Sequence, residues 1–342
     1  MVTATSEKPR FWKRLAQNVV LSVVVFFFCA AAFELVLRLD GYGHLEIYEP
    51  DASLYWKLKP NQNCFTKIGH KPVHINSQGT RGKDFQEKKE ASTLRVLCLG
   101  DSRTFGWGLS EEETYSGLLE SSLQNQQDKF KKVEVINAGV NAWSYPQMLV
   151  YFRQAVTRYR PDFVILGEAN LWTQFSENNS PEFVSKFMNR VRLKNILRRS
   201  AIYHFVVEVK LKDFYERNRT RFIPVDPSQD TLFKQQQKDD PEVVFRQAIE
   251  RLCHAAQNQG VKPLLLYLPS FDEAQSTNST SVLKAKQVVS EKLGIPLIDL
   301  TPEVRAKGKE LYLEADPVHY NSLGNQLIAR RIFETLASLN RQ

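Results

Sequence analysis

The longest pattern of apolar positions lies near the N-terminus. Residues 19–33 are apolar apart from one serine, and the run reaches Leu39 if Glu34 and Arg38 are tolerated near its end. The resulting 21 residues, 19–39, are close to the ~20 needed to cross a bilayer as a helix. Glu34 and Arg38 stand four residues apart, so they can pair on one helix face at the membrane interface. The pattern therefore predicts a transmembrane anchor at residues 19–39.

Basic residues precede this run and indicate its orientation. They are Lys8, Arg10, Lys13 and Arg14, and positive charge stays on the cytoplasmic side of a membrane. We expect residues 1–18 to be cytoplasmic and the main body to lie outside the cytoplasm, as a single-pass protein of the cell membrane. The alternative is a cleaved signal peptide, with a small-residue cleavage site at residues 30–32. Both alternatives place the main body outside the cytoplasm, and this disfavours nucleic acid as a partner.

Beyond residue 93, short apolar runs alternate with helical patterns. The runs are continuous, as in strands that are buried on both faces of a sheet. They occupy residues 94–99, 133–138, 163–166, 261–268 and 295–300. This order predicts an α/β domain at residues 94–342, with a five-stranded parallel sheet covered by helices on both faces. Residues 40–93 are predicted to be a juxtamembrane segment of short, irregular elements.

A long interval separates the third and fourth runs and predicts an insertion at about residues 173–241. The chain has a net charge of +8, and residues 186–221 hold eleven basic and three acidic residues, which equals that excess. Within the insertion, apolar residues recur at helical spacing: Phe183, Val184, Phe187, Met188 and Val191. An insertion of this length is typical of a lid, a cap or a binding element. A cap should turn the apolar stripe toward the carboxyl edge of the sheet; a membrane-resting helix should turn it outward beside the anchor.

A candidate nucleophile follows the first apolar run. Gly100 and Asp101 form a tight turn that presents the Ser102 hydroxyl at the sheet edge, where sites of parallel sheets lie. A serine needs a base to remove its proton, usually a histidine oriented by an acid. Of the six histidines, His319 lies beyond the fifth run, with Asp316 three residues ahead of it. This pair is the best base and orienting acid that the sequence offers.

Ester chemistry also needs hydrogen-bond donors for the developing oxyanion. The Ser102 amide is one candidate. Gly139 follows the second run and permits close backbone approach to a substrate, and Asn170 follows the third run and offers a side-chain amide. All three come from the carboxyl ends of predicted strands.

These motifs, in this order, resemble the SGNH/GDSL hydrolase superfamily over about residues 94–339. The resemblance implies a flavodoxin-like three-layer α/β/α sandwich, and ester hydrolysis or acyl transfer without a metal or an organic cofactor. Carried over, Ser102 is the nucleophile, His319 the base and Asp316 its partner, and the Ser102 amide, Gly139 and Asn170 form the oxyanion hole.

One block departs from the family's usual Gly-x-Asn-Asp. This chain has Gly-Glu-Ala-Asn-Leu at residues 167–171, so Asn170 lies one residue further from the glycine, and Leu171 replaces the acid. The prediction is a membrane-anchored serine esterase that acts on acyl esters of an envelope or exported glycan or lipid. The alternatives are an O-acyltransferase that uses the same residues and a non-catalytic, glycan-binding scaffold.

Overall fold

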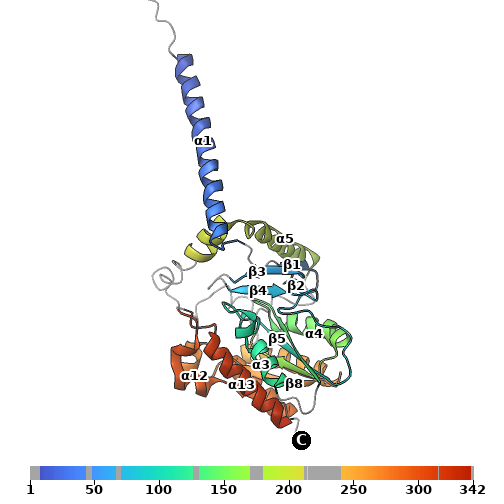
Figure 1. Ribbon diagram of the computed structural model, residues 1–342. Helices are drawn as coiled ribbons and strands as arrows, with labels where there is room; N and C mark the ends of the chain where they lie inside the picture. The colour runs from blue at the N-terminus through green and yellow to red at the C-terminus, as the bar shows by residue number, and fades with distance from the viewer. Residues whose placement is uncertain are drawn as a thin grey trace, which may run out of the picture.

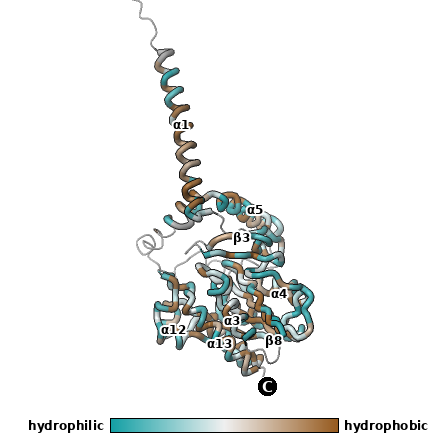
Figure 2. Tube along the Cα trace, in the orientation of Figure 1, coloured by the Kyte–Doolittle hydropathy of each residue, from teal (hydrophilic) through white to brown (hydrophobic). Residues whose placement is uncertain are grey.

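The computed structural model describes residues 8–43, 48–66, 71–125, 131–169, 180–211, 214, 240–314 and 316–339. Helix α1, Lys8–Leu39, projects from the body of the protein and is apolar along most of its length (Figures 1 and 2). Its stretch Phe11–Leu39 is long and apolar enough to cross a membrane, a property that a signal sequence also has. The predicted pairing of Glu34 with Arg38 is confirmed at 2.7 Å.

The central sheet has five parallel strands, one at each predicted apolar run. In chain order they are β5 (Thr93–Gly100), β6 (Lys132–Gly139), β7 (Phe163–Leu166), β8 (Lys262–Tyr267) and β9 (Leu297–Asp299). Their spatial order is β6-β5-β7-β8-β9. This is the 2-1-3-4-5 order of flavodoxin-like sheets, so the predicted fold class is confirmed.

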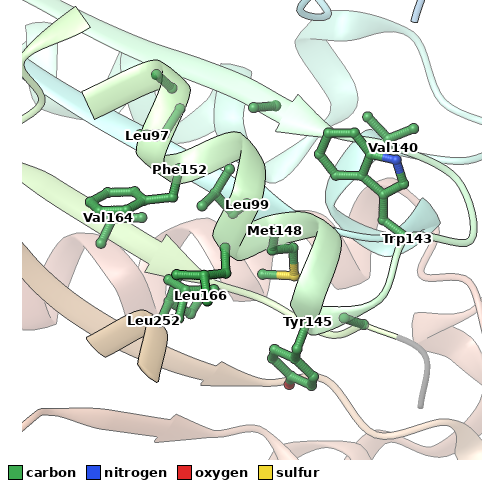
Figure 3. Close-up of a cluster of buried hydrophobic side chains, with 14 of the residues drawn as sticks. Leu97, Leu99, Val140, Trp143, Tyr145, Met148, Phe152, Val164, Leu166 and Leu252 are labelled. Carbon is green, nitrogen blue, oxygen red and sulfur yellow. The ribbon is translucent and has the colours of Figure 1, made fainter. Parts of the chain in front are cut away.

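Helices cover both faces of this sheet because successive residues of a strand point to opposite sides. Leu97 and Leu99 face one core, which includes Met148 and Phe152 of helix α4 (Figure 3). Val96 of the same strand faces the other core. The first layer contains α4 (Tyr145–Tyr159), α9 (Pro241–Gln257) and α11 (Ser281–Leu293). The second contains α3 (Tyr115–Gln124), α12 (Thr301–Lys307) and α13 (Ser322–Leu339).

The juxtamembrane segment forms two short antiparallel hairpins. They are β1 (Tyr48–Asp51) with β2 (Tyr55–Leu58), and β3 (Gln62–Phe65) with β4 (Pro72–Ile75). Leu54 and Ile75 are fully buried in the same core as Leu97. An isolated bridge also joins Arg81 to Asn137 of β6. The described residues of 48–66 and 71–81 therefore share the core of the domain, and the predicted boundary at residue 94 stays a prediction.

The described part of the insertion contains helix α5 (Pro181–Leu197), α6 (Ala201–Tyr203) and the π-helix η2 (His204–Leu211). The predicted apolar stripe of α5 packs on the β1–β2 hairpin, where Phe187 stacks on Trp56 at 5.2 Å. Val191 is buried in that contact. The stripe therefore packs on the aromatic side chains of β2, while Phe183 at its start stays 36% exposed.

The remaining short helices connect these layers. They are α2 (Ser102–Phe105), η1 (Glu111–Glu113), α10 (Phe271–Gln275) and η4 (Gly308–Leu311).

Candidate active site

The chain turns sharply between strand β5 and the short helix α2, and this turn carries Ser102. The Asp101 side chain caps α2 by accepting a hydrogen bond from the Arg103 N–H at 2.9 Å. At Gly100, a Cβ atom would lie 2.0 Å from Thr104 Oγ1, so the tight turn requires glycine. The sequence thus places Ser102 at the first position of α2, at the carboxyl end of the sheet.

The structure brings together the three residues that the sequence predicted as nucleophile, base and acid. Ser102 Oγ lies 2.8 Å from His319 Nε2. On the other side of the ring, His319 Nδ1 lies 2.7 Å from Asp316 Oδ2. The second oxygen, Asp316 Oδ1, accepts from the backbone N–H groups of Val318 and His319 at 3.0 and 3.2 Å.

These contacts keep the Asp316 carboxyl ionised. Burial alone would raise its pKa. The hydrogen bond from His319 and the two backbone N–H donors lower the pKa by more than burial raises it, so the net pKa lies below the usual 3.8. The stability that these contacts contribute is present above the ordinary pKa and is lost as the pH falls through the lowered one. Near neutral pH, therefore, a carboxylate faces His319 Nδ1 and favours a proton on that nitrogen.

Trp107 lies against the face of the His319 ring, with centroids 5.6 Å apart and planes 28° apart. This stacking limits how far the imidazole can rotate away from Ser102.

A buried arginine behind Ser102 was not predicted from the sequence. Arg81 is only 3% exposed, and its guanidinium donates to the carbonyls of Phe105 and Gly106 at 2.8 Å and of Leu109 at 2.5 Å. These carbonyls belong to the end of α2 and the loop after it. Arg81 therefore fixes the segment that follows Ser102. Its location in a turn-rich stretch of sequence carried no signal of this role.

Of the predicted oxyanion donors, Gly139 lies within the described residues and Asn170 does not. Gly139 ends β6 opposite Gly100, and its N–H donates to Asn137 Oδ1 at 3.1 Å. A Cβ atom at Gly139 would lie 2.2 Å from the backbone nitrogen of Phe105, so glycine here lets α2 pack on β6. Asn170 lies outside the described residues.

A buried ion pair involves Glu168, which belongs to the departing block at residues 167–171. Lys286 Nζ lies 2.6 Å from Glu168 Oε1, and the side chains are 0% and 3% exposed. The same carboxylate oxygen accepts from the Leu268 N–H at 3.1 Å, and the Glu168 carbonyl accepts from the Asp101 N–H at 2.8 Å. Burial lowers the pKa of Lys286, and the Glu168 charge opposes that shift. Glu168 therefore links the turn that carries Ser102 to the ends of β7 and β8.

A three-layer α/β/α fold with a serine, a histidine and an aspartate in contact at the carboxyl edge of its sheet has the architecture of a serine hydrolase. The GDSL-like Lipase/Acylhydrolase family matches residues 98–327, and the chain belongs to that family. It is accordingly a serine ester hydrolase or acyltransferase.

Several solved structures are similar to this chain. A lipase/acylhydrolase from Enterococcus faecalis is 15% identical with a TM-score of 0.43, over 71% of this chain and 95% of that one. A psychrotrophic esterase from Pseudoalteromonas sp. is 14% identical with a TM-score of 0.44, over 72% and 99%. A two-domain esterase active on acetylated mannans is 14% identical with a TM-score of 0.44, over 73% and 50%. No curated protein sequence matches the chain.

Proposed function

We propose that the chain is a membrane-anchored serine esterase in which Ser102, His319 and Asp316 form the catalytic triad. The observation that carries this proposal is the continuous line of contacts from Ser102 Oγ through the imidazole to the Asp316 carboxylate, at 2.8 and 2.7 Å. The same contacts argue against the non-catalytic scaffold, because a binding surface has no need of this arrangement.

In the proposed reaction, His319 Nε2 takes the Ser102 proton as Oγ attacks the carbonyl carbon of an acyl ester. Asp316 holds the imidazole in the required tautomer and stabilises the imidazolium that forms. His319 then returns the proton to the leaving alcohol, which departs as the tetrahedral intermediate collapses to an acyl-enzyme. Water, activated by the same base, releases the acid and restores the serine.

The developing oxyanion would be stabilised by the Ser102 amide, Gly139 and Asn170. A single donor of this kind lowers the activation free energy by about 3 kcal/mol. For Gly139 to contribute, its N–H must turn from Asn137 Oδ1 toward the substrate oxygen. The substrate we propose is an acyl ester of an envelope or exported glycan or lipid, in keeping with the predicted position of the domain outside the cytoplasm.

A fluorophosphonate probe tests the nucleophile, since it forms a covalent adduct with an activated serine. The full-length chain should be labelled, and Ser102→Ala should lose both labelling and hydrolysis of a short-chain aryl ester. Ser121→Ala, at an exposed position of α3, is the matched control and should behave like the wild type. Equal labelling of Ser102→Ala and the wild type would refute the assignment.

Two further measurements decide the finer points. Supplying an acyl donor with a sugar acceptor separates hydrolysis from transfer, because acyl-sugar formed faster than free acid identifies a transferase. The intact mass and N-terminal sequence of the mature protein decide between a retained anchor, which we propose, and a cleaved signal peptide.

A further inference from the structure

The insertion is attached to the end of α1 by polar contacts. The Glu34 carboxylate accepts hydrogen bonds from the Ser200 hydroxyl and from the next two backbone N–H groups, at 2.8–3.0 Å. Arg38, which pairs with Glu34, also donates to the Arg199 carbonyl at 2.6 Å. Residues 199–202 are therefore held at the level of Glu34 and Arg38 along the helix.

Ring contacts extend this attachment on either side. Phe205 meets Phe33 of α1 edge-on at 6.2 Å and Tyr42 at 5.0 Å. His204 Nδ1 accepts from the Gly43 N–H at 2.9 Å. Contacts that span residues 33–43 and 199–205 hold the insertion in a fixed position relative to the helix.

The length of α1 places this attachment at a membrane surface. The 29 residues Phe11–Leu39 extend about 43 Å as a helix, whereas the hydrocarbon core of a bilayer is about 30 Å thick. Basic residues precede the apolar run, and the pair Glu34–Arg38 lies near its other end, so the pair belongs at the outward interface. Residues 199–205, which are bound to that pair, then lie at the same depth.

Large apolar side chains are exposed on this part of the insertion. On α5 they lie opposite the stripe that packs on β1 and β2: Leu193 is 59% exposed and Ile196 is 64% exposed, and Leu197 lies beside them. The exposed apolar residues that follow along the chain are Val206, Val207, Leu211 and Phe214. Aliphatic side chains this exposed within one segment indicate a surface that is covered in the working protein.

Positive charge surrounds these apolar side chains. Residues 181–211 contain seven basic and two acidic residues. The exposed cations are Lys186, Arg190, Arg192, Lys194, Arg199 and Lys210. Apolar residues interspersed with lysine and arginine are typical of helices that lie in the interface of a membrane with anionic lipids.

We propose that α5 and η2 rest on the outward surface of the bilayer that α1 crosses, with Leu193, Ile196 and Leu197 in the interface and the basic side chains on anionic phospholipid headgroups. Two observations select a bilayer as the occupant: the charge of the surface, and its continuity with α1 through Glu34 and Arg38. The inference rests on the proposed anchor. It makes the insertion a membrane support that fixes the distance of the domain from the lipid, in place of a cap over Ser102.

Spin-label accessibility in the full-length chain tests this proposal. Cys29→Ser removes the exposed cysteine, the other three being buried, and Ile196→Cys then carries the label; Lys307→Cys on α12 is the control position. In phosphatidylcholine–phosphatidylglycerol vesicles, we expect the label at 196 to collide readily with oxygen and to lose most of its collisions with an aqueous nickel chelate. The label at 307 should stay open to the chelate.

The charge contribution is tested by Arg190→Ser/Arg192→Ser, which should reduce the protection at 196 in anionic vesicles, as should high salt. Chelate access at 196 equal to that at 307, in a chain that still resists carbonate extraction, would overturn the membrane support and leave the anchor intact. Dipolar coupling between labels at 196 would overturn the proposal, because it would show that a second copy of the chain covers this surface.

Extraction of the chain by carbonate would overturn both the anchor and the membrane support. Hydrolysis of a soluble aryl ester, measured on each variant, reports separately on folding and on the proposed triad.

Discussion

Substitution of Lys286, which forms a buried ion pair with Glu168, tests how the site is supported. The Lys286→Met change keeps an unbranched side chain of similar volume but removes the ammonium group. Its hydrogen bonds to the Gly167 and Leu266 carbonyls, at 3.3 and 2.5 Å, disappear with it. The Glu168 carboxylate would remain 3% exposed, with the Leu268 N–H as its remaining donor among the contacts described above.

Removing one partner of such a pair leaves an uncompensated buried charge, at a cost of about 3–5 kcal/mol. A typical domain is stable by only about 5–15 kcal/mol. At roughly 2–4 °C per kcal/mol for a domain of this size, we expect the Tm to fall by at least about 6 °C. Glu168→Gln/Lys286→Met removes both charges of the pair, so it should lose less stability than the sum of the two single changes.

The assay is thermal unfolding of the full-length chain in detergent, followed by circular dichroism for all four members of the double-mutant cycle. A cost below about 1 kcal/mol, or additive effects in the cycle, would refute the reasoning.

Three other changes test the site itself. Asp316→Asn should reduce kcat by about 10³–10⁴ with an unchanged circular dichroism spectrum, because the His319 tautomer is no longer held; a loss below tenfold in ester hydrolysis would contradict this. Arg81→Met should lower kcat more than it raises KM, since the segment after Ser102 loses three hydrogen bonds to its carbonyls; equal changes in both constants, measured on the aryl ester, would count against a positioning role. Gly139→Ala should reduce soluble expression and Tm, because its Cβ would lie 2.2 Å from the Phe105 nitrogen; wild-type Tm would show that α2 can move aside at little cost.

The strands were the most predictable part of the fold. Residues 163–166 were predicted as a strand and form β7 with those bounds, and the other four strands differ from their predicted runs by one or two residues at each end. Continuous apolar runs reveal such strands because both faces of a parallel sheet are buried. The partner of the α5 stripe was not predictable, since periodicity identifies an apolar face and leaves open what covers it.

For the candidate site, predictability depended on sequence motifs. Ser102, His319 and Asp316 could be proposed because their chemistry needs those residue types at the ends of strands. Arg81 could not, because it acts on backbone carbonyls that any sequence would supply. Lys286 could not either, because a lysine on an amphipathic helix normally faces solvent, and its partner Glu168 lies 118 residues away.

The contact between Ser102 and His319 joins residues 217 positions apart, and this separation has a consequence in time. At about 5–20 residues per second, synthesis of the intervening chain takes roughly 10–40 s. During that interval α1 and the turn at Ser102 have been synthesised, but His319, the proposed base, has not. With the proposed triad, the growing chain has no esterase activity, and hydrolysis should begin only when residue 319 has emerged and docked against the completed sheet.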